Sequence, residues 1–390
     1  MHRWTFAGLA ALAALLTLTS VAFADTSANG ISHRNVCAQA PAGYAHCHSK
    51  VAVGPHGKPI RQQPVDYTGL ELQDAYNLAG PAAATDGTGP TIAIVDAFGY
   101  ADAERDLNVY RQANGMQPCT TANGCFTKLD QRGGSAYPAT DTGWAQETAL
   151  DLDMASAACP KCKLVLVQAD TNSFVNLGAA ENTAAGLNPV AISNSYGGPE
   201  FSLETSAQYA SPYNHPGIAI TVSSGDSGYG VEFPAAANTV VAVGGTSMKN
   251  PSPGVFSESA WSGAGSGCSA YFGKKSWQTD SGCARRSVAD VSAVADPNTG
   301  VQVYGPTGSG PGWMVFGGTS ASAPFIAGAY GAQNDSAGID YPGKLPYAKR
   351  GSLNDVTSGS NGRCRTYLCT GGPGYDGPTG LGTPNTAAAF

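Results

Sequence analysis

The sequence has few charged residues. Only 13% of its 390 residues are Asp, Glu, Lys or Arg, which is about half the proportion in an average soluble protein. A basic excess is also absent, because 21 Lys and Arg stand against 28 Asp and Glu, and the net charge is −7. Nucleic-acid binders normally carry a basic patch or stripe, so that class is not indicated. Hydrophobic residues make up 42%, which argues against a disordered chain and allows a large core.

Long apolar runs are absent after the N-terminus. Residues 1–24 have the pattern of a secretory signal: Arg3 supplies the positive start, residues 6–21 the apolar stretch and residues 22–24 the small-x-small cleavage pattern. An uncleaved membrane anchor is the alternative, because the apolar run approaches spanning length. Cleavage after this segment would free the chain from the membrane, so we expect a secreted protein. We also expect a monomer.

The ten cysteines form an even set. In an exported chain this predicts disulfides between sequence neighbours. The Cys159–Cys162 pair could instead be a redox or half-zinc motif, but no second CxxC motif or nearby His completes a zinc site. The predicted pairs are Cys37–Cys47, Cys119–Cys125, Cys159–Cys162, Cys268–Cys283 and Cys364–Cys369.

Internal repeats are absent, and from residue 68 onward short apolar strands alternate with helical stretches. This alternation indicates an α/β fold with a doubly wound, mostly parallel sheet that helices cover on both faces. Residues 25–63 show little periodicity and are interpreted as a short N-terminal leader before one domain at 64–390. The predicted strands are residues 91–95, 164–167, 190–193, 218–223 and 240–243, and the predicted helices are residues 101–114, 144–158, 172–185 and 203–211.

A candidate nucleophile stands among small residues. Ser320 lies in the octapeptide at 317–324, which runs into the apolar stretch 325–329. A serine at a helix start has its own N–H and the helix dipole directed at developing negative charge. A Thr-Ser pair before a helix can also be an ordinary N-cap, but the whole octapeptide favours a nucleophile.

The sequence lacks a histidine suited to activate this serine. Apart from His2 and His215, every histidine lies in the segment 25–63, and His215 precedes a proline in a turn. The predicted helix at 144–158 offers Glu147 and Asp151 instead, which project from one face because they are four residues apart. Two carboxyls that share a proton have separated pKa values, so one of them can act as base. A solvated acidic face is the alternative, but the neighbouring residues are mostly apolar.

An acidic residue follows the predicted strand at 218–223. The Gly-Asp-Ser-Gly sequence at 225–228 resembles the nucleophile loop of chymotrypsin-like proteases, but the histidine setting of those antiparallel barrels is absent. Asp226 at a strand end can point into a site instead. Its protonated carboxyl could donate a hydrogen bond to an oxyanion if its pKa is raised or the solution is acidic.

Together these segments resemble the sedolisin family of serine-carboxyl peptidases, which includes the kumamolisins. Residues 144–151 match the family's Glu-x-x-x-Asp helix, residues 223–226 its oxyanion segment, and residues 318–320 with Pro324 its nucleophile. The similarity runs from about residue 65 to residue 390, which would make 64–390 the peptidase domain. The resemblance implies a subtilisin-like fold and the catalytic residues Ser320, Glu147, Asp151 and Asp226.

The resemblance also implies binding residues. Ser195, Tyr196 and Gly197 would form an edge on which extended substrate pairs, and Trp144 could line a subsite or anchor its helix. Asp96 ends the first strand, where subtilisins keep a triad Asp, but it is assigned no catalytic role. A calcium site of the family would use Asp355, Val356, Gly372, Gly374 and Asp376, whose carboxylate and carbonyl oxygens suit Ca²⁺.

Family members usually carry a long inhibitory prodomain, whereas only residues 25–63 precede the matched region here. The expected function is hydrolysis of protein or peptide substrates at acidic pH, since the usual pKa of Glu is near 4.3 and that of His near 6.5. A non-catalytic exported binding protein with the same fold is the alternative, and a conventional subtilisin that uses His215 is a third possibility.

Overall fold

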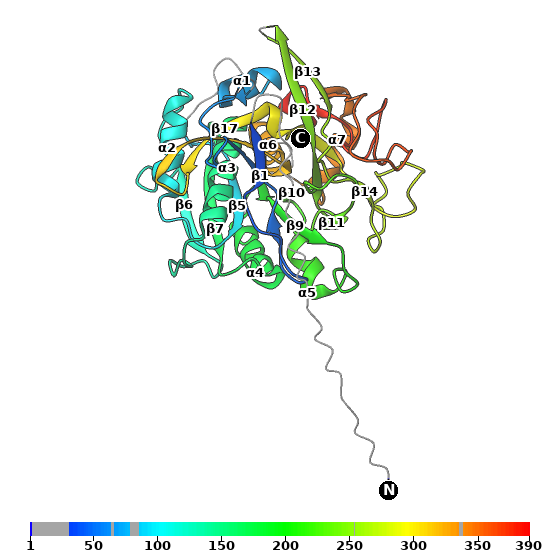
Figure 1. The fold of residues 1–390 in the computed structure, drawn as a ribbon, viewed down its shortest axis with the longest axis horizontal. Helices are drawn as coiled ribbons and strands as arrows, with labels where there is room; N and C mark the ends of the chain where they lie inside the picture. The colour runs from blue at the N-terminus through cyan, green and yellow to red at the C-terminus, as the bar shows by residue number, and fades with distance from the viewer. Residues whose placement is uncertain (2–30, 64–65, 79–85, 253, 335–337) are drawn as a thin grey trace.

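The computed structural model describes residues 1, 31–63, 66–78, 86–252, 254–334 and 338–390 (Figure 1). The predicted signal, residues 1–24, lies outside the described residues apart from its first one. Within the described part, no helix has both the length and the apolar character that crossing a bilayer requires.

An eight-stranded sheet organises the domain (Figure 1). Its order is β13-β12-β10-β8-β5-β7-β6, with β16 paired to β12. All pairs are parallel except β12 with β13, which confirms the predicted, mostly parallel α/β sheet. The strands are β5 (Thr91–Ala97), β6 (Phe126–Asp130), β7 (Lys163–Ala169), β8 (Ala191–Asn194), β10 (Ala219–Ser223), β12 (Val241–Ser252), β13 (Val255–Ala260) and β16 (Val291–Val294).

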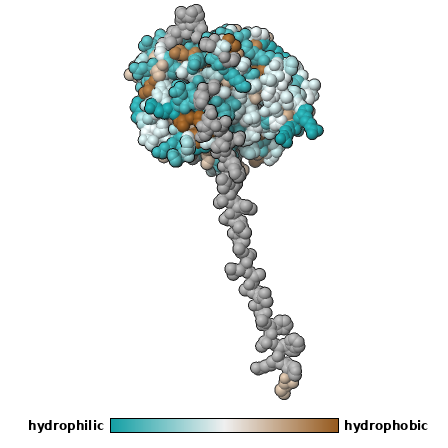
Figure 2. Space-filling view, turned by 45° about the horizontal axis from the view of Figure 1, so that its top comes forward, coloured by the Kyte–Doolittle hydropathy of each residue, from teal (hydrophilic) through white to brown (hydrophobic). Residues whose placement is uncertain are grey.

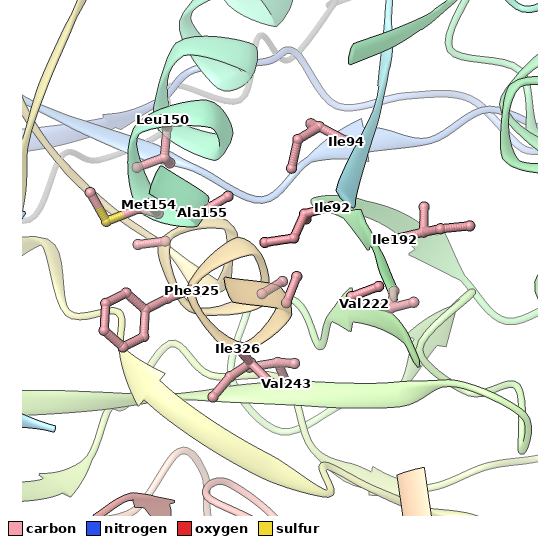
Figure 3. Packing of buried hydrophobic residues seen from close by; sticks show 14 of the residues in the cluster. Ile92, Ile94, Leu150, Met154, Ala155, Ile192, Val222, Val243, Phe325 and Ile326 are labelled. Atoms are coloured by element: carbon pink, nitrogen blue, oxygen red, sulfur yellow. The ribbon is translucent and has the colours of Figure 1, made fainter. Parts of the chain in front are cut away.

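Two buried helices, α3 (Thr142–Ala158) and α6 (Thr319–Gln333), pack against each other and against the sheet. Asp141 caps α3 by accepting from the N–H of Trp144. Small residues allow the close approach, since a Cβ at Gly328 of α6 would lie 2.4 Å from Ala158 Cβ. Figure 3 shows part of the resulting core, which contains residues from both helices and from the strands: Leu150, Met154, Ala155, Phe325, Ile326, Ile92, Ile94, Ile192, Val222 and Val243.

The other helices are shorter or cover the sheet elsewhere. Helix α4 (Phe174–Ala185) packs against β5 and β7, and α2 (Ala103–Ala113) against α3. The predicted helix at 203–211 is shorter in the structure, which has α5 (Ala207–Ala210) and then a 3₁₀ turn. The remaining elements are α1 (Gly69–Ala75), α7 (Leu345–Ala348), β14 (Gly267–Cys268), β15 (Ser287–Val288), β19 (Leu353–Asn354) and β20 (Thr383–Pro384).

The segment interpreted as a leader contributes strands to the domain. A five-stranded sheet has the order β1-β3-β18-β17-β4, and a three-stranded sheet has the order β11-β9-β2. Strands β1, β2 and β3 all come from residues 25–63, so from residue 31 this segment is paired with the rest of the fold. These strands are β1 (Ser32–Asn35), β2 (His46–Cys47), β3 (Lys50–Val53), β4 (Asp66–Tyr67), β9 (Tyr196–Pro199), β11 (Glu232–Phe233), β17 (Gly300–Pro306) and β18 (Pro311–Gly317).

All five predicted disulfides are formed, which confirms the pairing of sequence neighbours. Cys37–Cys47 is the one that lies within the N-terminal segment. On the face shown in Figure 2, hydrophobic areas are small and separated by polar ones, as single exposed apolar side chains normally are.

Candidate active site

The three predicted catalytic segments meet near the carboxyl end of β10. Ser320 lies in the first turn of α6, Glu147 lies in α3, and Asp226 follows the last residue of β10, Ser223. Ligand sites of open parallel sheets lie at such strand ends. The N–H of Thr319 donates to Asp226 Oδ1 at 2.8 Å and so joins the loop after β10 to the start of α6.

A carbonyl oxygen lies between Ser320 and Asp226. It belongs to His48 and accepts a hydrogen bond from the N–H of Ser320 at 3.0 Å. A Cβ atom at Gly318 would lie 2.2 Å from this oxygen and 2.5 Å from Asp226 Oδ2, so both oxygens border the same glycine. We call this space, between the N–H of Ser320 and Asp226 Oδ2 and above Gly318, the oxyanion pocket.

Asp226 is suited to donate a proton in the oxyanion pocket. Its Oδ2 atom is buried and has no hydrogen-bond partner among the described residues. Burial raises the pKa of Asp226, while Lys50, His48 and the hydrogen bonds from Thr319 oppose that shift. A carboxyl that keeps its proton can stabilise an oxyanion as a hydrogen-bond donor.

Glu147 and Asp151 form a buried carboxyl cluster with Asp96 of β5. All three side chains are fully buried, so the two helical carboxyls do not form a solvated face. Burial, and then the charge of Asp96, raises the pKa values of Glu147 and Asp151 well above their usual range, and burial raises the pKa of Asp96 to about 7. Adjacent buried carboxyls cannot all ionise, so the cluster shares protons. Asp96 had no predicted role, yet it lies beside the expected base.

The hydroxyl of Ser320 interacts with Glu147 and acts to lower the pKa of that carboxyl, but both residues also have other partners. Ser320 Oγ donates to the carbonyl oxygen of Ser195 at 3.3 Å. Glu147 Oε2 accepts a hydrogen bond from Ser49 Oγ, a residue of the N-terminal segment. The hydroxyl of Ser49 therefore competes with that of Ser320 for the carboxylate.

The predicted substrate edge, Ser195 to Gly197, leads into and forms part of β9, and it is paired with β2 of the same chain. His46 stands opposite Gly197, and Cys47 opposite Tyr196. The side chain of Tyr196 points into the core, where it bonds to Asn194, so it is the backbone that faces β2.

Trp144, also predicted to bind substrate, is only 4% exposed. Its ring lies 6.3 Å from the rings of Phe98 and Tyr196. This packing matches the alternative that Trp144 anchors α3, and it leaves little surface for a ligand.

Sequence reasoning missed a pocket around His48. Its Nδ1 atom forms a hydrogen bond with Ser223 Oγ at 2.8 Å, and its Nε2 with Glu232 Oε2 at 2.9 Å. Burial alone would lower the pKa of His48, but Glu232 and Asp226 outweigh it and raise the pKa. His46, His48 and Glu232 are also the only group of three or more possible metal ligands found among the described residues, although two of them are paired with each other.

The predicted calcium ligands come from two segments near the C-terminus, residues 355–356 and 372–376, which are in contact. The N–H of Gly374 donates to Asp355 Oδ2 at 2.8 Å, and the N–H of Gly372 donates to Asp376 Oδ2 at 3.0 Å. Burial raises the pKa of Asp376 to about 6, hydrogen bonds oppose the shift, and the charge of Asp355 adds to it. Val356 is also buried. Two carboxylates that repel each other beside one turn offer the all-oxygen donor set of a calcium site, so the residues fit the ion.

Gly318→Ala is expected to lower kcat/KM by about 100-fold or more, because the added methyl group would enter the oxyanion pocket. Gly318 also has a φ of +102°, so part of any effect is backbone strain. Gly310→Ala is the matched control, since Gly310 has a φ of +131° and open space around the added Cβ. Kinetics with circular dichroism on both variants checks the prediction, and equal activity losses would contradict it.

Known proteins are similar in sequence to most of this chain. No protein-family model matches the chain. The chain is 30% identical to kumamolisin of Bacillus sp. (strain MN-32) over an alignment of 363 residues that covers 82% of this chain and 62% of the relative. It is 28% identical to sedolisin of Pseudomonas sp. (strain 101) over 350 residues, 76% of this chain and 56% of the relative. The chain thus spans less than two thirds of the length of these curated relatives.

Solved structures share the fold. Pseudomonas sedolisin, a serine-carboxyl proteinase complexed with two molecules of pseudo-iodotyrostatin, has a TM-score of 0.70 and 24% identity, covering 83% of this chain and 96% of that chain. Fervidolysin from Fervidobacterium pennivorans, a keratinolytic enzyme related to subtilisin, has a TM-score of 0.51 and 15% identity, covering 78% of this chain and 42% of that chain. The fold is therefore the predicted subtilisin-like α/β fold.

Proposed function

Because the chain belongs to the sedolisin family of serine-carboxyl peptidases, we propose that it cleaves peptide bonds with Ser320, Glu147 and Asp226. The observation that carries the proposal is the oxyanion pocket, where the N–H of Ser320 already holds a peptide carbonyl beside Asp226. The substrates are proteins or peptides that pair in extended form with β9.

Ser320 Oγ attacks the substrate carbonyl carbon, and Glu147 accepts the proton of the hydroxyl. The negative charge that develops on the carbonyl oxygen is stabilised by the N–H of Ser320 and by the protonated carboxyl of Asp226. Glu147 then gives the proton to the leaving amine, and water hydrolyses the acyl-enzyme by the reverse sequence. Asp151 and Asp96 hold the remaining protons of the carboxyl cluster and so set the charge of Glu147.

This chemistry favours acidic pH. Asp226 donates only while protonated, and its pKa is raised by burial. A histidine base, whose usual pKa is near 6.5, would be protonated in acid, whereas the usual pKa of a glutamate base is near 4.3. Burial raises the pKa of Glu147, and that effect lessens where solvent or substrate reaches the carboxyl. The predicted signal and the five disulfides support a role outside the cell, in an oxidising compartment.

Digestion of an acid-unfolded protein by the purified chain tests the function. New peptides identified by mass spectrometry are the expected result. A chain that folds but releases none would instead be a non-catalytic binding protein with the same fold.

A bound Ca²⁺ would be held by Asp355 and Asp376 with the carbonyl oxygens of Val356, Gly372 and Gly374, and it would neutralise the two carboxylates. Chelation is therefore expected to lower the melting temperature by about 5 °C, because an ion that binds only the folded chain stabilises it. Calorimetry with a chelator, and then with added Ca²⁺, measures the effect. Asp355→Asn is the control and should not respond. An unchanged melting temperature in the wild-type chain would rule out the site.

A further inference from the structure

Two imidazoles of the N-terminal segment lie on one side of an extended chain. His46 begins β2 and His48 follows its last residue, so their side chains project in the same direction because strand residues two apart share a face. Their rings are 5.1 Å apart and meet edge to face. Two nitrogen ligands can therefore approach one ion from the same strand.

A glycine lets these imidazoles reach a carboxylate on another strand. Strand β9 lies between β2 and β11, which carries Glu232. Gly197 of β9 stands opposite His46, and a Cβ there would lie 2.7 Å from His48 Cε1 and 3.1 Å from Glu232 Oε2. A side chain at this position would fill the space in which the imidazoles and the carboxylate meet.

The three side chains form one donor set. The ligand atoms of His46, His48 and Glu232 all lie within 4.8 Å of one another. His48 Nε2 and Glu232 Oε2 are 2.9 Å apart, close to the separation of about 3.4 Å that bonds of about 2.0–2.1 Å impose in a tetrahedral zinc site. An ion would take the place of the proton between Nε2 and the carboxylate, and small side-chain rotations would bring in His46.

His48 is held in the way that a metal ligand usually is. Its Nδ1 atom lies 2.8 Å from Ser223 Oγ, and metal-bound histidines commonly donate through the second ring nitrogen to an oxygen of the protein. The imidazole is fully buried, and the side chain of Glu232 is 14% exposed. The orientation of both ligands is therefore fixed by the fold.

The ring nitrogens of His46 have no other partner. The residue is 8% exposed, and in the described part of the chain its side chain contacts the ring of His48 but forms no hydrogen bond. A buried polar group without a partner costs free energy. Glu232 and Asp226 place negative charge near the two imidazoles, and Lys50 places positive charge there. Imidazole nitrogens suit Zn²⁺ and similar transition metals better than Ca²⁺.

We propose that His46, His48 and Glu232 form a Zn²⁺ site with water as the fourth ligand, and that the ion fastens residues 46–48 to β11 across β9. Both histidines belong to the N-terminal segment and the carboxylate to a strand that follows β10, so the ion joins the two. The carbonyl oxygen of His48 occupies the oxyanion pocket, so bound Zn²⁺ would keep the segment over the candidate active site.

Calorimetric titration of the Ser320→Ala chain with Zn²⁺ at about pH 7, in excess Ca²⁺, tests the site. One ion per chain is expected to bind, with a dissociation constant of about 1 μM or lower. His46→Gln and Glu232→Gln each remove a ligand and should weaken binding by about 100-fold or more, whereas Ser223→Ala removes only the partner of Nδ1 and should weaken it by about tenfold. His56→Gln, which changes an exposed histidine of the same segment, is the matched control and should bind Zn²⁺ as the parent chain does.

A folded parent chain that binds no Zn²⁺, or binding that His46→Gln and Glu232→Gln both leave unchanged, would overturn the site. Circular dichroism establishes that each variant is folded. Co²⁺ in place of Zn²⁺ should give the strong visible absorption of a tetrahedral ion, and His46→Gln should lose it. The weak spectrum of an octahedral ion in the parent chain would contradict the four-ligand site.

Hydrogen exchange tests whether the ion fastens the segment. The N–H of His48, which donates to the carbonyl oxygen of Ser195 at 3.1 Å, should exchange at least about tenfold more slowly when Zn²⁺ is present at about 100 times its dissociation constant. Zn²⁺ should not change this rate in Glu232→Gln. Equal rates with and without the ion, in a parent chain that binds it, would overturn the fastening. Neither measurement uses peptidase activity, so both are independent of the proposed function.

Discussion

Ser320→Ala is expected to lower kcat/KM for peptide-bond hydrolysis by about 10⁶-fold, because the nucleophile of a serine peptidase cannot be replaced by the rest of the site. Glu147→Gln should cause a loss of similar size, since an amide cannot accept the proton of Ser320. Steady-state kinetics with a fluorogenic peptide at acidic pH measures both variants.

His215→Ala is the matched control for these variants. His215 is the one histidine outside the N-terminal segment in the described part of the chain, and a conventional subtilisin mechanism would have to use it. Its removal should change kcat/KM by no more than about twofold. An active Ser320→Ala or an inactive His215→Ala would refute the assignment.

The melting temperature is expected to fall by about 10 °C or more between about pH 4 and about pH 8, which is the second large effect. The cause is a set of fully buried carboxyls whose pKa values are raised, chiefly by burial: Asp96, Glu147, Asp151, Asp153 and Glu181.

A carboxyl with a higher pKa in the folded chain stabilises the fold at pH values below its unfolded pKa. That contribution is lost as the pH rises through the folded pKa. Where the folded pKa exceeds the unfolded pKa by about 1, the lost free energy of unfolding is about 1.4 kcal/mol. His46, His33 and His215 act in the opposite direction, since burial lowers their pKa values, that of His46 to about 4. The five buried carboxyls outnumber these histidines.

Calorimetry of the Ser320→Ala chain, which avoids self-cleavage, measures this pH dependence. Asp153→Asn should reduce it, because a neutral amide replaces a buried carboxyl. Asp102→Asn should leave it unchanged, because Asp102 is 57% exposed. A melting temperature that rises from acid to neutral pH would contradict the account.

The low content of charged residues is related to the expected stability in acid. A chain with only 28 acidic residues has few carboxylates to lose in acid. The structure adds that several of these carboxyls are buried and favour the protonated form. The low charge and the buried carboxyls are therefore both expected to favour stability in acid.

The central sheet could be predicted because its strands are continuous apolar runs separated by helices. The segments of Ser320, Glu147 and Asp226 could be found because each carries a local pattern. The helix predicted at 203–211 is too long, since only residues 207–210 and the following 3₁₀ turn have helical backbone.

The N-terminal segment could not be placed from sequence. Strand β2 has only two residues, too few for any periodicity, and its partner β9 lies about 150 positions away. Glu232 belongs to no motif, and Asp96 is recognisable as part of the carboxyl cluster only through the packing of β5 against α3. The one local signal was the concentration of histidine and cysteine around residues 46–48.

The pH dependence of kcat/KM for the wild-type chain and for Asp226→Asn tests the central claim most directly. If a protonated Asp226 holds the oxyanion, wild-type activity is greatest below neutral pH and falls as this carboxyl ionises. Asp226→Asn, whose amide donates at every pH, then loses that alkaline fall. A wild-type kcat/KM that peaks above about pH 8, or an equal fall of kcat/KM at alkaline pH in both proteins, would contradict this role of Asp226.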